Sequence, residues 1–171
     1  NLNKYYFKNN SWKVLDTKWN IYTYWKSFNS KLFDPTNQEK TFSWYLEKFE
    51  DNRNNIIDYH YFKDNNQVYI DYIEYAGGLY KIDFNYYNKA NSLSNYRTHF
   101  EVKTSKLVDE IKFYTDRILI KQYKLEYDNK DAVFSHLINF SEQIINNSKT
   151  LIKVSDYSFG YGKAADLHRL K

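Results

Sequence analysis

The clearest pattern in the chain is an alternation of apolar and polar side chains over residues 79–86. The even positions from 80 to 86 are aromatic or aliphatic, and the odd positions from 81 to 85 are polar. A period of two is typical of a β-strand with one solvated face. The preceding run, residues 68–75, is apolar on both faces apart from Asp71 and Glu74. The intervening Ala76-Gly77-Gly78 supplies glycines that tolerate positive φ, so the two runs predict a β-hairpin.

Similar runs recur along most of the chain. A second hairpin is predicted over residues 107–127, with Thr115-Asp116-Arg117 as its turn. Residues 132–146 fit either helical spacing or alternation, and we favour a strand. Further β-prone runs flank predicted turns: two short runs within 12–24 around the turn 16–20, a turn at 34–37, and the runs 42–49 and 56–62 around the turn 51–55.

No Ser/Gly-rich linker divides these runs, and the only proline is Pro35. A length of 171 residues suits one domain, since domains commonly have about 100–200 residues. We therefore expect residues 1–171 to form a single β-rich, all-β segment. The 35 aromatic residues, 20% of the chain, suit the half-buried surface of a sheet, and an AT-rich genome also favours Tyr, Phe, Asn, Lys and Ile codons.

Composition excludes several classes of protein. The absence of cysteine excludes a disulfide scaffold, a thiolate nucleophile and a Cys-ligated zinc site. Apolar runs such as residues 118–120 are far shorter than the ~20 residues of a membrane-spanning helix. The chain starts at Asn1 and contains no Met, which leads us to expect a piece excised from a much larger protein.

The charge balance gives little support to nucleic-acid binding. The net charge of +4 comes from 25 Lys and Arg against 21 Asp and Glu, dispersed along the chain without basic blocks. Binding by counterion release requires clustered cations. We therefore expect no nucleic-acid partner.

No residue pattern predicts an active site or a metal site. The four histidines, His60, His99, His136 and His168, do not have the spacing of helical metal ligands. The carboxylate pairs Glu47/Glu50 and Asp109/Glu110 lie in charged or turn-proximal runs, and no phosphate-binding glycine loop occurs. We therefore expect a non-enzymatic segment without a cofactor or metal.

The order of short motifs along the chain resembles a known family. Each motif alone is common in β proteins, but the series covers nearly the whole chain. It resembles the plasmid virulence protein B (SpvB) family and the related B components (TcB) of Tc insecticidal toxins. The series includes Ser-Trp-Lys-Val at 11–14, Tyr-Thr-Tyr at 22–24, Asp-Pro at 34–35, Lys-Thr-Phe-Ser-Trp-Tyr-Leu at 40–46, Asp-Asn-Arg-Asn-Asn at 51–55, Tyr-His-Tyr at 59–61, Tyr-Ile-Glu-Tyr at 72–75, Ile-Asp-Phe-Asn-Tyr at 82–86, Tyr-Arg-Thr-His-Phe at 96–100 and Phe-Gly-Tyr-Gly at 159–162.

Three positions depart from the family pattern as we read it. Asn54 and His99 each replace a glycine within a turn, and Lys26 stands where a glycine is expected after the Tyr-Thr-Tyr motif. Asparagine tolerates left-handed φ, so Asn54 is expected to preserve its turn. The local geometry at His99 and Lys26 is less certain to follow the family.

The resemblance implies both an architecture and a role. Family members are large secreted or surface-delivered bacterial virulence proteins, in which this segment forms part of a β-rich shell built with tyrosine-aspartate (Rhs-type) repeats. The implied fold is a series of consecutive antiparallel hairpins forming a curved, open sheet. The implied partners are the rest of the same polypeptide, a toxic cargo domain that the shell encloses or carries, and a pore-forming toxin component.

Two alternatives remain open. The chain could be a free-standing aromatic-rich module that recognises glycans or a host surface through exposed aromatic rings. The candidate residues are Trp12, Trp19, Trp25 and Trp44, of which Trp12 and Trp44 also suit a role as core anchors. A small-ligand β-barrel would instead require a closed sheet around an interior cavity.

Overall fold

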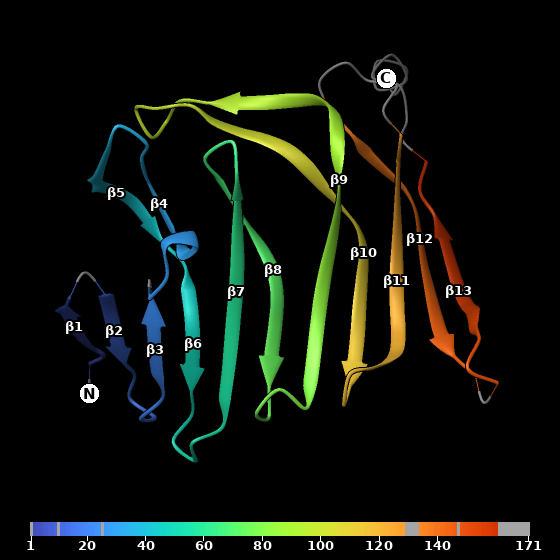
Figure 1. Ribbon diagram of the computed structural model, residues 1–171, viewed down its shortest axis with the longest axis horizontal. Coiled ribbons are helices and arrows are strands. Elements are labelled where there is room, and N and C mark those ends of the chain that lie inside the picture. Colours follow the sequence, from blue (N-terminus) through green and yellow to red (C-terminus); the bar gives the residue numbers. More distant parts are fainter. Residues whose placement is uncertain (1, 10, 25, 129–133, 147, 161–171) are drawn as a thin grey trace, which may run out of the picture.

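The computed structural model describes residues 2–9, 11–24, 26–128, 134–146 and 148–160, and most of them lie in strands (Figure 1). The elements are β1 (Lys4–Lys8), β2 (Ser11–Leu15), β3 (Ile21–Tyr24), the short 3₁₀ helix η1 (Phe28–Ser30), β4 (Lys31–Asp34), β5 (Asn37–Trp44), β6 (Leu46–Glu50), β7 (Ile56–Asp64), β8 (Gln67–Tyr75), β9 (Tyr80–Asn95), β10 (Val102–Thr115), β11 (Ile118–Asp128), β12 (His136–Ile145) and β13 (Leu151–Ser158). No helix among these residues is long and apolar enough to cross a membrane.

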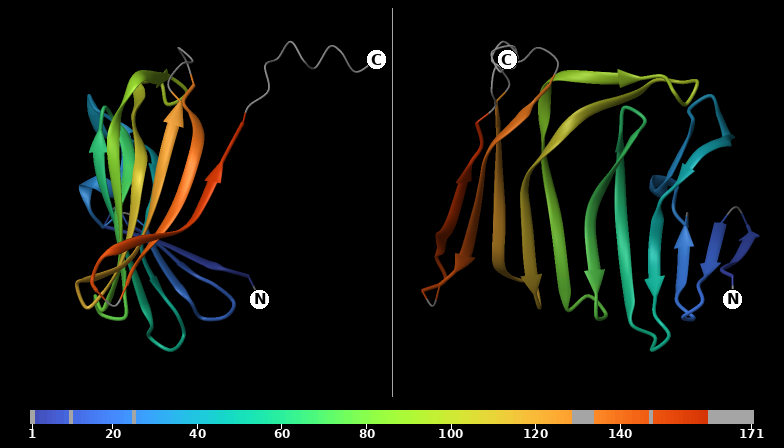
Figure 2. Two further views of the ribbon diagram at one scale, coloured as in Figure 1. Left: turned by 90° about the vertical axis from the view of Figure 1, so that its right-hand side faces the viewer. Right: turned by 180° about the vertical axis from the view of Figure 1, so that it is seen from behind.

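The described strands form one wide sheet and one small one. Eleven strands make an antiparallel sheet in the order β1-β2-β3-β6-β7-β8-β9-β10-β11-β12-β13, and β4 pairs with β5 in a separate two-stranded sheet. Figure 2 shows the large sheet twisted along its width, with β1 and β13 at its two edges. The prediction of an all-β, curved and open sheet is confirmed. An open sheet of this kind excludes the alternative of a closed sheet around a ligand cavity.

Both predicted hairpins are present. Ala76, Gly77 and Gly78 all adopt positive φ in the turn between β8 and β9, and Asp116 and Arg117 do so between β10 and β11. The strand favoured within residues 132–146 is β12, although residues 132 and 133 lie outside the described residues. The edge strands β1 and β13 were not predicted from the sequence.

The prediction of one continuous run over residues 42–49 is wrong. The chain leaves the small sheet after Trp44 and enters the large sheet at Leu46. Between them, the backbone N–H of Tyr45 donates to the carbonyl of Ser30 at 2.8 Å, which ties the crossing point to the end of η1. This contact is between residues distant in sequence, so local alternation does not reveal it.

Three turns at the same end of the sheet share one hydrogen-bonding pattern. Each starts with Asp or Asn, whose side-chain oxygen accepts the backbone N–H groups two and four residues later. The fourth residue of each turn has positive φ: Trp19 (66°), Asn54 (63°) and Lys149 (59°). The prediction that Asn54 preserves its turn is confirmed. His99 also has positive φ (68°), so its backbone adopts a conformation that favours glycine.

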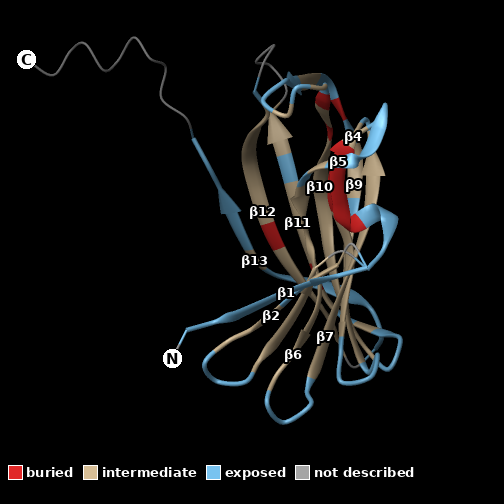
Figure 3. Ribbon diagram, turned by 90° about the vertical axis from the view of Figure 1, so that its left-hand side faces the viewer, coloured by how far each residue is buried: buried red, intermediate tan, exposed pale blue. Residues whose placement is uncertain are grey.

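The core is small for a chain of this length. Among the described residues the buried hydrophobic side chains are Leu32, Phe33, Val68, Tyr69 and Val102. In Figure 3 most buried segments lie around β4 and the adjacent part of the sheet, and a further one lies on β12. Among the described elements, η1 and the small β4–β5 sheet are those outside the large sheet. Most of the large sheet is therefore a single layer.

The core forms where the β9–β10 hairpin bends across the turn between β7 and β8 (Figure 1). Lys103 donates its backbone N–H to the carbonyl of Asn65 at 3.0 Å, and the side-chain amide of Asn66 donates to the carbonyl of Glu101 at 2.9 Å. The buried Tyr69 hydroxyl accepts the backbone N–H of Ser105 at 3.0 Å. These contacts bring Val102 against Leu32 and Val68.

Candidate functional site: the two faces of the sheet

The strand register assigns most side chains of the large sheet to one of two faces, because residues paired across antiparallel strands lie on the same side. One face, called here the aromatic face, is mostly apolar, although by the same register it also carries the ion pair between Lys121 and Glu142 at 3.1 Å. Successive pairs such as Tyr22 with Phe49, Phe49 with Ile57, and Ile73 with Ile82 carry this face across the sheet. Its members include Val14, Tyr22, Phe49, Ile57, Ile73, Ile82, Phe113, Tyr123, Phe140 and Tyr157.

Ring contacts link neighbouring strands on the aromatic face. The ring centroids of Tyr22 and Phe49 lie 5.1 Å apart, and those of Phe113 and Tyr123 lie 5.6 Å apart in an edge-to-face arrangement. Tyr123 also stacks on Phe140 at 5.0 Å. Such contacts are worth about 0.5–1.5 kcal/mol each beyond burial. The rings are nevertheless only half-buried, because no second layer covers this part of the sheet.

The opposite face, called here the polar face, carries charges that are paired with one another from β6 to β13. Lys48 contacts Glu50 at 3.1 Å, and Lys81 contacts Asp83 at 2.8 Å. Further along, Glu110 contacts Lys112 at 2.6 Å and Lys124 at 3.3 Å, and Lys153 contacts Asp156 at 2.9 Å. This face is therefore solvated and close to locally neutral over most of its width.

Glu110 is the centre of the best-connected group on the polar face. The hydrogen bond from Lys112 lowers the pKa of Glu110, and bonds from Asn85 and Lys124 act in the same direction. Reciprocally, the hydrogen bond to Glu110 raises the pKa of Lys112. Both groups therefore stay charged at neutral pH and hold β9, β10 and β11 together across the strands.

His60 and Tyr72 form a stacked pair on the polar face. Their ring centroids lie 4.1 Å apart with an interplanar angle of 13°. The ammonium group of Lys81 lies 4.2 Å from the Tyr72 ring centroid, and the Nε2 atom of His60 lies 3.8 Å from Glu74. His60 of β7 therefore contacts Tyr72 of β8 across the two strands, and Lys81 of β9 contacts the same tyrosine ring.

Two tyrosines bond to backbone instead of leaving their hydroxyls in water. The hydroxyl of Tyr61 donates to the carbonyl of Leu46 at 2.6 Å, and that of Tyr86 donates to the carbonyl of Ile70 at 2.7 Å. Burial is the main cause that raises the pKa of each of these tyrosines to about 12. These residues thus connect strands as well as covering the core.

The structure separates the predicted tryptophans. Trp12 and Trp44 lie edge to face with ring centroids 6.2 Å apart, and Trp12 also contacts Phe7 at 4.8 Å. Trp19 is 68% exposed at the turn between β2 and β3. Trp25 lies outside the described residues. Of the three described candidates, Trp12 and Trp44 are in contact, whereas Trp19 lies at a turn.

The titratable groups considered as catalytic or metal-binding candidates also lie apart. His60 lies in β7, His99 in the turn after β9 and His136 at the start of β12, whereas His168 lies outside the described residues. Glu47 accepts the backbone N–H groups of Lys26 and Ser27. Within the described ranges, no group of three His, Cys, Asp or Glu side chains is placed to hold a metal ion.

Comparison with known proteins identifies relatives of this fold. Residues 3–77 match the family model described as "Salmonella virulence plasmid 65kDa B protein" (SpvB). The crystal structure of TcdB2-TccC3-Cdc42 superposes with a TM-score of 0.81 at 16% identity, over 92% of this chain and 10% of that chain. The N-terminal domain of the effector protein SpvB from Salmonella typhimurium strain LT2 superposes with a TM-score of 0.75 at 16% identity, over 83% of this chain and 64% of that domain.

A further sequence match is to Protein Ycf2 of Physcomitrium patens. It has 29% identity over 181 aligned positions, covering 85% of this chain and 8% of Ycf2. A likeness of that extent carries no function to this chain. This chain covers only 10% of the TcdB2-TccC3-Cdc42 chain, at 16% identity. The comparisons with solved structures therefore establish the fold alone. The predicted resemblance to SpvB and the Tc toxin B components is confirmed by the match over residues 3–77 and by the shared fold of most of the chain.

Proposed function

We propose that this chain is a non-enzymatic structural segment of a secreted or surface-delivered bacterial toxin or virulence protein. In this role the sheet forms part of a shell wall that encloses or carries a toxic effector domain. The rest of a larger polypeptide supplies the remaining wall, and a pore-forming toxin component is a further partner. The proposal rests on one observation above all: a single-layer sheet with an aromatic face and a polar face.

The aromatic face gives the proposal its physical basis. Side chains such as Phe113, Tyr123 and Phe140 stay partly exposed, although burying such a side chain fully is worth up to about 1.5–3 kcal/mol. A wall whose aromatic face lines an enclosed space would bury these rings against a cargo polypeptide or further wall. The paired charges of the polar face would then face water.

The open edges are consistent with a segment of a longer wall. β1 and β13 each pair on one side only among the described strands. Unpaired backbone groups at a sheet edge favour the addition of another strand. Further strands of the same polypeptide are the natural continuation, as expected if residues 1–171 are an excised segment.

Site-specific crosslinking in the full-length protein tests the proposal. The photoreactive amino acid p-benzoylphenylalanine would replace Phe113 on the aromatic face or, as a matched control on the same strand, Lys112 on the polar face. Crosslinks from position 113 to an effector domain or to enclosed wall segments, with none from position 112, are the expected result. Equal labelling from both positions, or a full-length reading frame without wall repeats or a toxin domain, would overturn the proposal.

A further inference from the structure

The polar face differs in charge at β1, at β2 and at Lys26, two residues after the end of β3. Four lysines, Lys4, Lys8, Lys13 and Lys26, are exposed there. In the register between β1 and β2, Lys4 lies opposite Leu15, Tyr6 opposite Lys13, and Lys8 opposite Ser11. Lys13 in turn lies opposite Thr23, which lies opposite Lys48 of the polar face. The fold thus gathers cations that the sequence disperses.

These lysines differ from the other lysines of the polar face in having no carboxylate partner. Lys48, Lys81, Lys112, Lys124 and Lys153 each contact an Asp or Glu. No ion pair joins Lys4, Lys8, Lys13 or Lys26 to any carboxylate of the described residues. The net positive charge of this face is therefore concentrated at one end of the sheet.

Two carboxylates beside these lysines accept hydrogen bonds from local backbone groups. Asp16 accepts the backbone N–H groups of Lys18 and Asn20 and the side-chain amide of Asn20, which lowers the pKa of Asp16. Glu47 accepts the backbone N–H groups of Lys26 and Ser27. Both carboxylates hold local backbone structure. Glu50 and Asp58 line a hollow with Lys13 and Lys26, and Glu50 is paired with Lys48.

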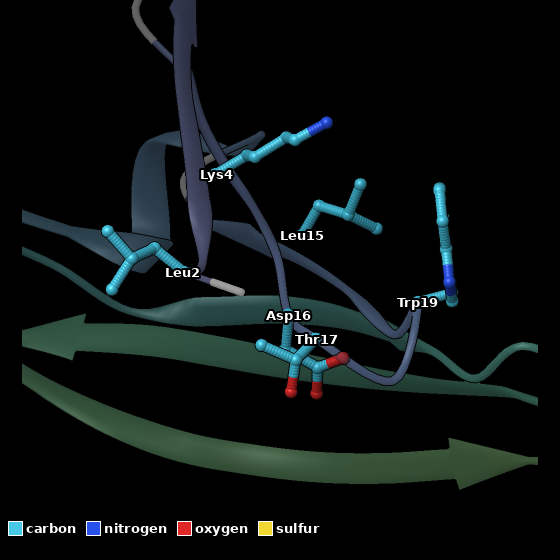
Figure 4. A pocket seen from close by; sticks show the side chains of 6 residues that line it. All are labelled: Leu2, Lys4, Leu15, Asp16, Thr17 and Trp19. Atoms are coloured by element: carbon cyan, nitrogen blue, oxygen red, sulfur yellow. The ribbon is translucent and has the colours of Figure 1, made fainter.

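Exposed aromatic rings accompany the lysines. Trp19 is 68% exposed and borders a hollow of about 220 Å³ that Leu2, Lys4, Leu15, Asp16 and Thr17 also line. Figure 4 shows the indole edge-on at one side of this hollow, with a ring face turned toward Leu15. A second hollow is lined by Tyr6, Lys8, Asn9, Ser11, Lys13 and Lys26, and Tyr6 is 52% exposed.

The backbone of Trp19 adds to the argument. A left-handed φ costs a non-glycine residue roughly 1–2 kcal/mol, and the equivalent turn positions carry the smaller Asn54 and the polar Lys149. The shared turn geometry therefore holds this large ring at an exposed position. We call the strip formed by Trp19, Lys4, Tyr6, Lys13, Lys8 and Lys26 the basic track.

We propose that the basic track binds an anionic polysaccharide. The flat C–H faces of pyranose rings would pack on Trp19 and Tyr6, and the four ammonium groups would bind sulfate or carboxylate groups along the chain. The track from Lys4 to Lys8 alone is roughly 14 Å long, at about 3.4 Å per strand residue, so it would hold an extended oligosaccharide. This inference concerns the polar face and stands apart from the proposed role of the aromatic face.

The residue types favour a polysaccharide over a nucleic acid. The cations of the track are all lysines, which act as point charges and lack the planar fork with which arginine reads phosphates and bases. Binding of single-stranded nucleic acid uses aromatic rings on which successive bases stack, whereas Trp19 and Tyr6 border separate hollows. The Thr17 hydroxyl adds a group that can bond to sugar hydroxyls, and the Ser11 hydroxyl, which donates to the carbonyl of Tyr24 at 3.1 Å, can still accept a hydrogen bond.

Binding of the protein to heparin, measured by titration at several salt concentrations, tests the inference. The triple variant Lys8→Gln/Lys13→Gln/Lys26→Gln should bind about tenfold or more weakly, and the slope of log affinity against log salt should fall by about one per lysine removed. Tyr6→Ala should weaken binding with the slope unchanged. Hyaluronan, which has carboxylates only, separates the carboxylate contribution from that of sulfate.

Matched controls isolate the track. Lys81→Gln/Lys124→Gln/Lys153→Gln removes the same charge from paired sites, and Tyr5→Ala removes a 65%-exposed ring from the opposite face of β1. Both controls should bind heparin within about twofold of the unmodified protein, because neither lies on the track. Equal losses in the controls, binding to neutral dextran, or equally tight binding of a single-stranded DNA oligonucleotide would overturn the inference.

Discussion

Replacing Tyr69 by phenylalanine would test how the bend in the β9–β10 hairpin is held. The Tyr69 hydroxyl accepts two backbone N–H groups of β10, from Ser105 at 3.0 Å and from Lys106 at 3.3 Å. Its ring stacks on Phe62 at 5.3 Å, and a phenylalanine ring would preserve that contact. The substitution therefore removes only the acceptor.

The expected cost follows from what is left without a partner. A buried donor that loses its acceptor costs about 1–3 kcal/mol, and Ser105 is only 9% exposed. The amide of Lys106 is less buried, so the loss of its acceptor should cost about 1 kcal/mol, the low end of that range. Together the two losses should lower the free energy of unfolding of Tyr69→Phe by roughly 2–4 kcal/mol. In Tyr86→Phe the lost hydroxyl is a donor to the carbonyl of Ile70, and the expected cost is about 1 kcal/mol.

Urea unfolding followed by circular dichroism would give both free energies. Hydrogen exchange of the Ser105 and Lys106 amides would show whether the loss is local, since both should exchange faster in Tyr69→Phe than in Tyr86→Phe. A cost for Tyr69→Phe no larger than that of Tyr86→Phe, with unchanged exchange at both amides, would refute the assignment of the hydroxyl as the acceptor that holds the bend.

Three further changes probe other parts of the molecule. Leu32→Ala in the core should cost about 2–5 kcal/mol in urea unfolding, against about 1 kcal/mol for Ile120→Ala, which is 45% exposed. Lys149→Gly should stabilise by about 0.5–1 kcal/mol in thermal unfolding, because relief at φ 59° exceeds the entropy cost of glycine. Burial and then repulsion from Lys31 lower the pKa of Lys63 from 10.5 to about 8. Between pH 8 and pH 10.5 the unfolded chain keeps a proton on Lys63 that the folded protein releases, so the free energy of unfolding rises with pH over this range. The variant Lys63→Met should lack this rise when unfolding midpoints are compared across the same pH values.

The hairpins were predictable because their signals are local. Alternation over residues 79–86 and the glycines after Ala76 are enough to specify a strand and a tight turn, and both are present. Asn54 was predictable for the same reason, since tolerance of positive φ belongs to the residue itself.

The features that were not predictable depend on residues distant in sequence. The separation of β5 from β6 is fixed by the bond from Tyr45 to Ser30, and the bend of β10 by Tyr69 with Ser105. Likewise, the cluster of Lys4, Lys13 and Lys26 is formed by the register of three strands, whereas the sequence contains no basic block. Trp19 was a candidate binding residue from its residue type alone. The sequence of its turn does not predict that its side chain is exposed.

The strand order also has a consequence for how the chain folds. Every strand of the large sheet pairs with its immediate neighbour in sequence except at β3 and β6, where the η1–β4–β5 excursion intervenes. Such nearest-neighbour pairing requires little loop closure for each added strand, which favours rapid folding compared with β-sandwiches of higher contact order. The sheet can therefore grow one hairpin at a time from a nucleus such as β7–β8, as the polypeptide is synthesised.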